Sequence, residues 1–158
     1  MTERDILKYT LEQLKAKGID HANCSLVKST KYEMNVEAGN MSLIRTVFNN
    51  SLGIYVIKNN QSGSYSVNKL DQATIDQAIQ TVIEIAESSE PDPAHGIAEY
   101  QPAQEFSSGP KEPDQDLMYA RLEQFLKSAE AKYPNIMLEN AYFDFTYSSS
   151  FVANTNGV

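Results

Sequence analysis

The spacing of apolar residues changes between Val67 and Asp71, and that change restricts the folds this chain can form. From Tyr32 to Val67 apolar side chains recur at every second position, which is typical of strands with one buried face. From Asp71 to Ala86 they recur at steps of three and four, which is typical of a helix with one buried side. Strands followed by a helix that can cover them predict an α+β fold.

Four short strands are predicted in the alternating region, and Asn and Gly mark the turns between them. The strands are expected at about 32–38, 41–47, 52–56 and 65–67. Turns are expected at Gly39-Asn40, at Asn49-Asn50 and at 59–63. Such short connections give an antiparallel meander. Gly53 lies inside a strand, which indicates a bulge, the close approach of another backbone or simple packing.

Three segments carry a helical period. The first has Thr2 and Asp5 at the spacing of a capping box and Gly18 as a stop signal. The second begins at the N-cap residue Asp71, and the third starts after Pro113 and ends at Pro134. Their predicted buried faces are, in chain order, Ile6, Leu7, Thr10, Leu11 and Leu14; Ile75, Ala78, Ile79, Val82, Ile83 and Ala86; and Met118, Leu122, Phe125, Leu126 and Ala129.

The domain organisation is predicted from where these patterns stop. Residues 1–88 are expected to form an N-terminal domain, residues 89–112 a proline-rich linker or loop, and residues 113–158 a helix and an incomplete β-hairpin. The linker is either an ordered surface loop or a flexible connector. Asn156-Gly157 after an alternating strand is a hairpin signal, so we expect the chain to be the N-terminal piece of a longer protein.

Composition excludes some classes of function. The chain has 158 residues and a net charge of −8, with no cluster of Lys and Arg, so direct binding of nucleic acid is not expected. No stretch approaches the roughly 20 apolar residues of a membrane span, and no signal peptide is apparent. A single cysteine, Cys24, fits a reducing compartment. We therefore expect a cytoplasmic protein without a membrane partner.

The residues that could carry chemistry do not form a recognisable motif. His21 and Cys24 have a spacing that occurs in metal sites, but two ligands do not make a site, and Cys24 is expected to be buried. His95 could be a ligand or a general base, although a solvated loop histidine is the simpler interpretation. No helix carries the two histidines and the glutamate of a zinc peptidase.

The acidic and hydroxyl residues do not form a recognisable catalytic motif either. Asp71 and Asp76 are interpreted as a helix cap and a surface residue, and Glu90, Asp92 and Glu99 as a solvated acidic stretch. The serines at 148–150 lack the glycines of a nucleophile elbow. We therefore assign no catalytic, cofactor-binding or metal-binding residue to this chain, and we predict that it is inactive as an enzyme on its own.

Several segments resemble the first domain of the PmbA/TldD family, bacterial proteins related to a zinc peptidase. The resemblance rests on 37–40 (Glu-Ala-Gly-Asn), 52–56 (Leu-Gly-Ile-Tyr-Val), 63–67 (Gly-Ser-Tyr-Ser-Val) and the closing segment 151–157. The segments 89–93 and 96–99 are more similar to the PmbA branch than to the TldD branch. No catalytic position of the family maps onto these residues, because the resemblance implies a zinc motif in the later half of TldD-type chains, a motif that PmbA-type chains commonly lack.

The resemblance implies a function that the residues alone do not. It implies a noncatalytic N-terminal domain of a metallopeptidase subunit, which helps form a dimeric proteolytic chamber and present peptides. The expected partners are a TldD/PmbA-type subunit or a second copy, with peptides as substrates, and zinc has its place in the full-length protein or its partner. The alternative is a protein-binding regulatory module, of the kind that modulates DNA gyrase, with no role in peptide hydrolysis.

Overall fold

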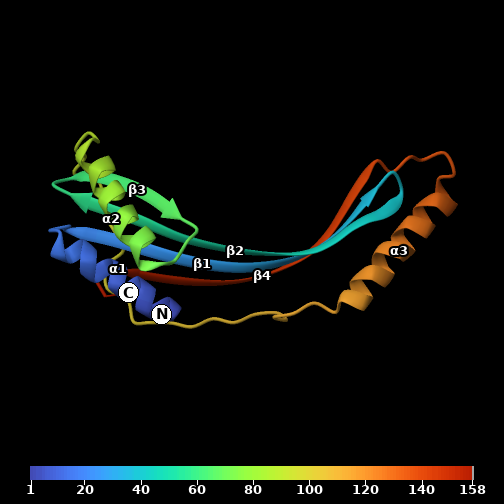
Figure 1. Ribbon diagram of the computed structural model, residues 1–158, viewed down its shortest axis with the longest axis horizontal. Coiled ribbons are helices and arrows are strands. Elements are labelled where there is room, and N and C mark those ends of the chain that lie inside the picture. The colour runs from blue at the N-terminus through green and yellow to red at the C-terminus, as the bar shows by residue number, and fades with distance from the viewer. Residues whose placement is uncertain (158) are drawn as a thin grey trace. The chain divides into compact units, whose positions relative to one another are not determined.

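The computed structural model describes residues 1–157, which form one four-stranded antiparallel sheet and three helices (Figure 1). The sheet has the order β3-β2-β1-β4. The elements are α1 (Glu3–Ala16), β1 (His21–Glu37), β2 (Asn40–Lys58), β3 (Gln61–Val67), α2 (Gln72–Glu87), α3 (Gln115–Lys132) and β4 (Asn140–Asn154). The predicted α+β class is confirmed.

The strands are longer than predicted, and one predicted turn does not exist. Asn49 and Asn50 lie inside β2, which runs without a break from Asn40 to Lys58. Asparagine is common in turns, but it also occurs in strands, and neither residue adopts the positive φ of a tight hairpin turn. The two strands predicted at 41–47 and 52–56 are therefore one strand.

The two tight turns that do exist use residues with positive φ. Ala38 (φ 48°) and Gly39 (φ 77°) connect β1 to β2, one residue earlier than the predicted turn at Gly39-Asn40. Asn59 (φ 53°) and Asn60 (φ 63°) connect β2 to β3. Positive φ at both central residues is the geometry of a two-residue hairpin turn. Gly63, which was expected in this second turn, belongs to β3 and pairs with Val56.

The fourth strand of the sheet comes from the end of the chain. β4 lies next to β1. Directly after β4, the amide of Thr155 donates a hydrogen bond to the carbonyl of Ala22, which holds the end of β4 beside the start of β1. The side chain of Thr155 also accepts a hydrogen bond from the amide of Ala22, at 3.0 Å. The sheet therefore has four strands, but the meander that was predicted to contain about four supplies only β1 to β3, and the fourth, β4, comes from the segment predicted as an incomplete hairpin.

The helices agree closely with their predicted caps and faces. Thr2 and Asp5 form the capping box of α1, and Asp71 caps α2 by accepting a hydrogen bond from the amide of Thr74. The six predicted apolar positions of α2 are all buried. In α3, Met118 and Leu122 are buried as predicted, whereas Phe125 is 51% exposed.

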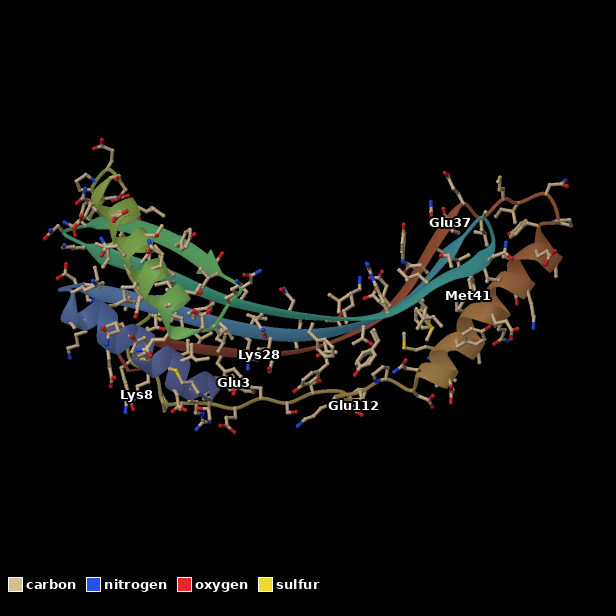
Figure 2. All side chains as sticks on the ribbon, viewed as in Figure 1. Glu3, Lys8, Lys28, Glu37, Met41 and Glu112 are labelled. Atoms are coloured by element: carbon tan, nitrogen blue, oxygen red, sulfur yellow. The ribbon has the colours of Figure 1, made fainter. Side chains whose placement is uncertain are left out.

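The chain divides into two compact units, which are described separately. The first comprises residues 1–28, 49–106 and 149–157, and in it α1 and α2 pack on one face of the strands (Figure 1). Glu3 of α1 and Lys28 of β1, labelled in Figure 2, form an ion pair at 2.7 Å. The core of this unit includes Leu14, Leu26, Leu52, Ile54, Ile75, Ile79 and Val82.

The second unit comprises Ser29–Phe48 and Ser107–Ser148. Its core is small and lies between α3 and one face of the strands. Met34 and Val36 of β1 pack with Met118 and Leu122 of α3. Partly buried residues around them are Met41 (labelled in Figure 2), Leu126, Ala141, Phe143 and Phe145. Phe143 and Phe145 of β4 therefore face this core.

The proline-rich segment is held on the first unit by hydrogen bonds. The amide of Asp92 donates to the carbonyl of Asn60, and the side chains of Asn154 and Asn156 both donate to the carbonyl of Ala98. These contacts favour the ordered surface loop over the flexible connector for this part of the segment. Among residues 1–157, no helix is both long enough and apolar enough to cross a membrane.

Candidate functional site

The structure separates His21 and Cys24. His21 is exposed at the start of β1, whereas Cys24 is fully buried in the core of the first unit. Positions 21 and 24 of a strand point to opposite faces of the sheet. Burial also raises the pKa of the Cys24 thiol to about 12, so the thiol stays protonated at neutral pH and does not act as a ligand. The two residues do not fit a shared metal ion.

The acidic residues considered above have structural partners. Asp71 caps α2, and hydrogen bonds from the backbone and side chain of Thr74 lower its pKa. Asp76 accepts a hydrogen bond from the hydroxyl of Tyr9 at 2.6 Å, which joins α2 to α1. Asp92 accepts from the amide of Ala94 within its own loop. Within residues 1–157, no three His, Cys, Asp or Glu side chains lie close enough together to hold a metal ion.

His95 has a partner that its sequence position did not reveal. Its Nε2 lies 3.1 Å from the hydroxyl oxygen of Ser62 at the start of β3. A hydroxyl and an imidazole at this distance can exchange a proton. In the part of the chain that the structure describes, no acid contacts the other ring nitrogen, so the pair is not a catalytic triad. The contact instead ties the loop after α2 to β3.

The second unit contains a buried carboxylate, that of Glu33, which is paired with basic side chains. The side chain of Glu33 is only 7% exposed, yet it forms ion pairs at 2.9 Å with both Lys31 and Arg45. Asn35 donates a third contact at 3.1 Å, while Lys31 also approaches Asp144. The hydrogen bond from Lys31, then that from Asn35, and the charge of Arg45 hold the pKa of Glu33 below its usual value. These partners satisfy a carboxylate that would otherwise be costly to bury.

The clearest candidate for ligand binding is a groove on the open face of the first unit. Its volume is about 470 Å³, and it lies on the side of the sheet opposite α1 and α2. We call it the open-face groove and define it by six residues on that face: Asn23, Ser25, Gly53, Tyr55, Ser64 and Ser66. The pairs Gly53–Ser66 and Tyr55–Ser64 face each other across β2 and β3.

The hydrogen-bonding groups of this groove are available to a ligand. Among residues 1–157, none of its five polar side chains makes a hydrogen bond or an ion pair to another residue. Each has at least one neutral donor or acceptor. The groove can therefore bind a neutral, hydrogen-bonding ligand, but it contains no acid, base or nucleophile pair with which to transform one.

The sequence contained two weak signals for this groove. Gly53 was compatible with the close approach of another backbone, but equally with a bulge or with simple packing. The second signal was the lack of charge, since the open-face positions of β2 and β3 around Gly53 carry Ser and Tyr instead of Lys or Glu. The serines and Tyr55 nevertheless occupy the polar positions of alternating strands, where they resemble ordinary solvent-facing residues.

Comparison with known families identifies the segment that contains most of the groove. Residues 24–86 match the model of the PmbA/TldA metallopeptidase domain 1. No sequence among the curated proteins compared with this chain matches it.

Solved structures share the fold. TldE from Thermococcus kodakarensis aligns with a TM-score of 0.78 at 20% identity, over 96% of this chain and 35% of its own. A proposed modulator of DNA gyrase from Bacteroides thetaiotaomicron VPI-5482 aligns with a TM-score of 0.68 at 16% identity, over 99% of this chain and 38% of its own. Another from Thermotoga maritima MSB8 aligns with a TM-score of 0.65 at 10% identity, over 99% and 36%. The chain thus spans just over a third of the length of each.

Proposed function

We propose, from the match of residues 24–86 to the PmbA/TldA metallopeptidase domain 1, that the chain is the N-terminal, noncatalytic part of a metallopeptidase subunit. Its role is to help form the wall of a dimeric proteolytic chamber and to present peptides. The observation that carries the proposal is the match to domain 1 of a metallopeptidase family. The fold shared with TldE over 96% of this chain supports it.

The proposal includes partners, metal and location. The partner is a TldD/PmbA-type subunit or a second copy of the protein, and the substrates are peptides. Zinc is held elsewhere in the full-length protein or by the partner, because His21 and Cys24 lie on opposite faces of β1. A cytoplasmic location rests on the single cysteine, and the net charge of −8 argues against nucleic acid as a partner.

Assembly and activity of the intact protein test this proposal. The longest natural reading frame that contains this chain would be purified alone and together with a TldD-type subunit from the same organism. Light scattering should show a dimer or a one-to-one complex, and the zinc-loaded complex should cleave a fluorescence-quenched decapeptide. A protein that stays monomeric in both preparations and cleaves no peptide would overturn the proposal.

A second candidate function follows from two of the solved structures, which are named as proposed modulators of DNA gyrase. In this alternative the chain is a protein-binding module that contacts gyrase and takes no part in peptide hydrolysis. Surface plasmon resonance with purified gyrase would distinguish the two functions. Saturable binding to gyrase by a protein without peptidase activity would favour the alternative.

A further inference from the structure

We propose that the open-face groove binds an uncharged segment of polypeptide in an extended conformation. The proposal rests on the proposed function, because it specifies where in this domain a peptide would lie. It concerns binding only, and no chemical step takes place in the groove.

The first argument is the position of Gly53. An ideal Cβ at this residue would lie 3.0 Å from the hydroxyl oxygen of Ser25, the free end of a short side chain, and no other side chain lies within 4 Å. Because Ser25 can rotate away, packing alone does not require glycine here. A glycine in a central strand also allows another backbone to approach the sheet closely. Gly53 is one of the residues that line the groove, where such an approach would occur.

The second argument is the kind of side chain around Gly53. The six residues that define the open-face groove are all Tyr, Ser, Asn or Gly, and Ile54 and Tyr65 complete its lining. This is the composition of antibody loops that bind polypeptides, in which tyrosine supplies contact area at low entropic cost and Ser, Asn and Gly supply adaptable hydrogen bonds. Because none of these residues is charged, the groove favours a neutral ligand over an acidic or a basic one.

The third argument is length. A second groove of about 390 Å³ adjoins the first, and the two share Tyr65 and Ser66. Its lining continues the same chemistry with Asn49, Asn50 and Ser51, and Lys69 is its one charged residue. Both grooves are shallow and open to solvent, so an elongated ligand can make more contacts there than a compact one. A chain segment with neutral, hydrogen-bonding groups along its length fits this surface.

Nuclear magnetic resonance can detect such binding even when it is weak. The isotope-labelled chain would be titrated with a capped hexapeptide of alternating alanine and serine, in 150 mM salt. The amide signals of Ser25, Gly53 and Ser66 should shift and saturate, while those of α1 should not. A capped hexapeptide of alternating alanine and glutamate should bind at least tenfold more weakly, because its three carboxylates meet only one cation along both grooves, Lys69, in a chain whose net charge is −8.

Two substitutions should weaken the binding without changing the fold. Gly53→Val adds a branched side chain to the lining of the groove, and Ser66→Lys adds a long charged side chain at an exposed position. Each should weaken binding of the neutral peptide at least tenfold. The matched control is Gly96→Ala, since a Cβ at Gly96 meets nothing within 4 Å. Ser66→Lys keeps the test decisive if Gly53→Val fails to fold.

Three results would overturn the proposal. These are saturation with no shift at the groove, unchanged binding in Ser66→Lys, and groove shifts that appear without peptide as the protein concentration rises. The last result would assign the groove to contacts between copies of the chain. The titration does not depend on the assembly test above, so a groove that binds no peptide in a protein that still forms an active complex would refute only this inference.

Discussion

An ideal Cβ on Gly63 would lie 2.5 Å from the carbonyl oxygen of Val82, and real Cβ atoms essentially never come within 3.0 Å of such an atom. The same atom would lie 2.7 Å from the amide nitrogen of Ala86. β3 therefore runs against α2 at a separation that only glycine permits. Gly63→Ala should lower the free energy of unfolding by about 1–3 kcal/mol or more, because the obstruction is backbone that cannot rotate away.

Urea denaturation of Gly63→Ala beside Gly96→Ala would measure this effect. Gly96 has no neighbour within 4 Å of its ideal Cβ, so its substitution should change stability by no more than about 0.5 kcal/mol. Equal midpoints for the two variants would show that β3 and α2 are not in close contact.

The buried side of α2 predicts a second contrast in stability. Ile79 is completely buried, whereas its neighbour Gln80 is exposed and contacts Glu84 on the outer face. Ile79→Ala should lower the free energy of unfolding by about 2–5 kcal/mol, because it leaves a cavity in the core. Gln80→Ala should stay within about 0.5 kcal/mol of the wild type. Thermal or urea melts of both variants would check the orientation of the helix, which would be wrong if the two losses were similar.

The turn between β1 and β2 contains a residue in an unfavourable conformation. Ala38 has a φ of 48°, a region that asparagine and glycine adopt more readily than alanine. Ala38→Asn would create the Asn-Gly sequence preferred in this type of turn. We expect it to stabilise the protein by up to about 1 kcal/mol. An unchanged or lower midpoint in urea would contradict the turn geometry.

Local signals predicted the helices well. The capping box of Thr2 and Asp5, the cap at Asp71 and the spacing of apolar residues all act within one or two turns, so the sequence alone reveals them. The prediction that Phe125 is buried is wrong. The helix α3 is weakly amphipathic, and its buried stripe is narrow and runs through Met118 and Leu122. A hydrophobic residue next to a buried stripe does not have to be buried.

Non-local pairing and the ligand groove were harder to predict. Nothing near Asn140–Asn154 in the sequence indicates that this strand lies next to β1, because the hydrogen bonds that place it join residues 133 positions apart, such as Ala22 and Thr155. The open-face groove depends on register, which brings Gly53 opposite Ser66 and Tyr55 opposite Ser64. Register follows from the exact turn positions, and the turn predicted at Asn49-Asn50 would have given a different one.

The buried carboxylate of Glu33 should make stability depend on pH. Its pKa is lowered from an ordinary value of 4.5, chiefly by the hydrogen bond from Lys31. The stabilisation is therefore fully present above about pH 4.5 and is lost as the pH falls through the lowered pKa. Glu33→Gln cannot titrate, so its urea midpoint should fall less steeply below pH 4.5 than that of the wild type. Parallel profiles for the two proteins would show that Glu33 is not ion-paired in solution.

The central claim is that this domain supplies no catalytic metal to the metallopeptidase subunit of which we propose it is a part. The most direct test is the zinc content of the purified chain, measured by mass spectrometry after incubation with excess zinc and exhaustive dialysis. We predict far less than one zinc per chain, because Cys24 is buried with a raised pKa and His21 points away from it. One tightly bound zinc per chain, lost in a His21→Ala variant, would contradict the account.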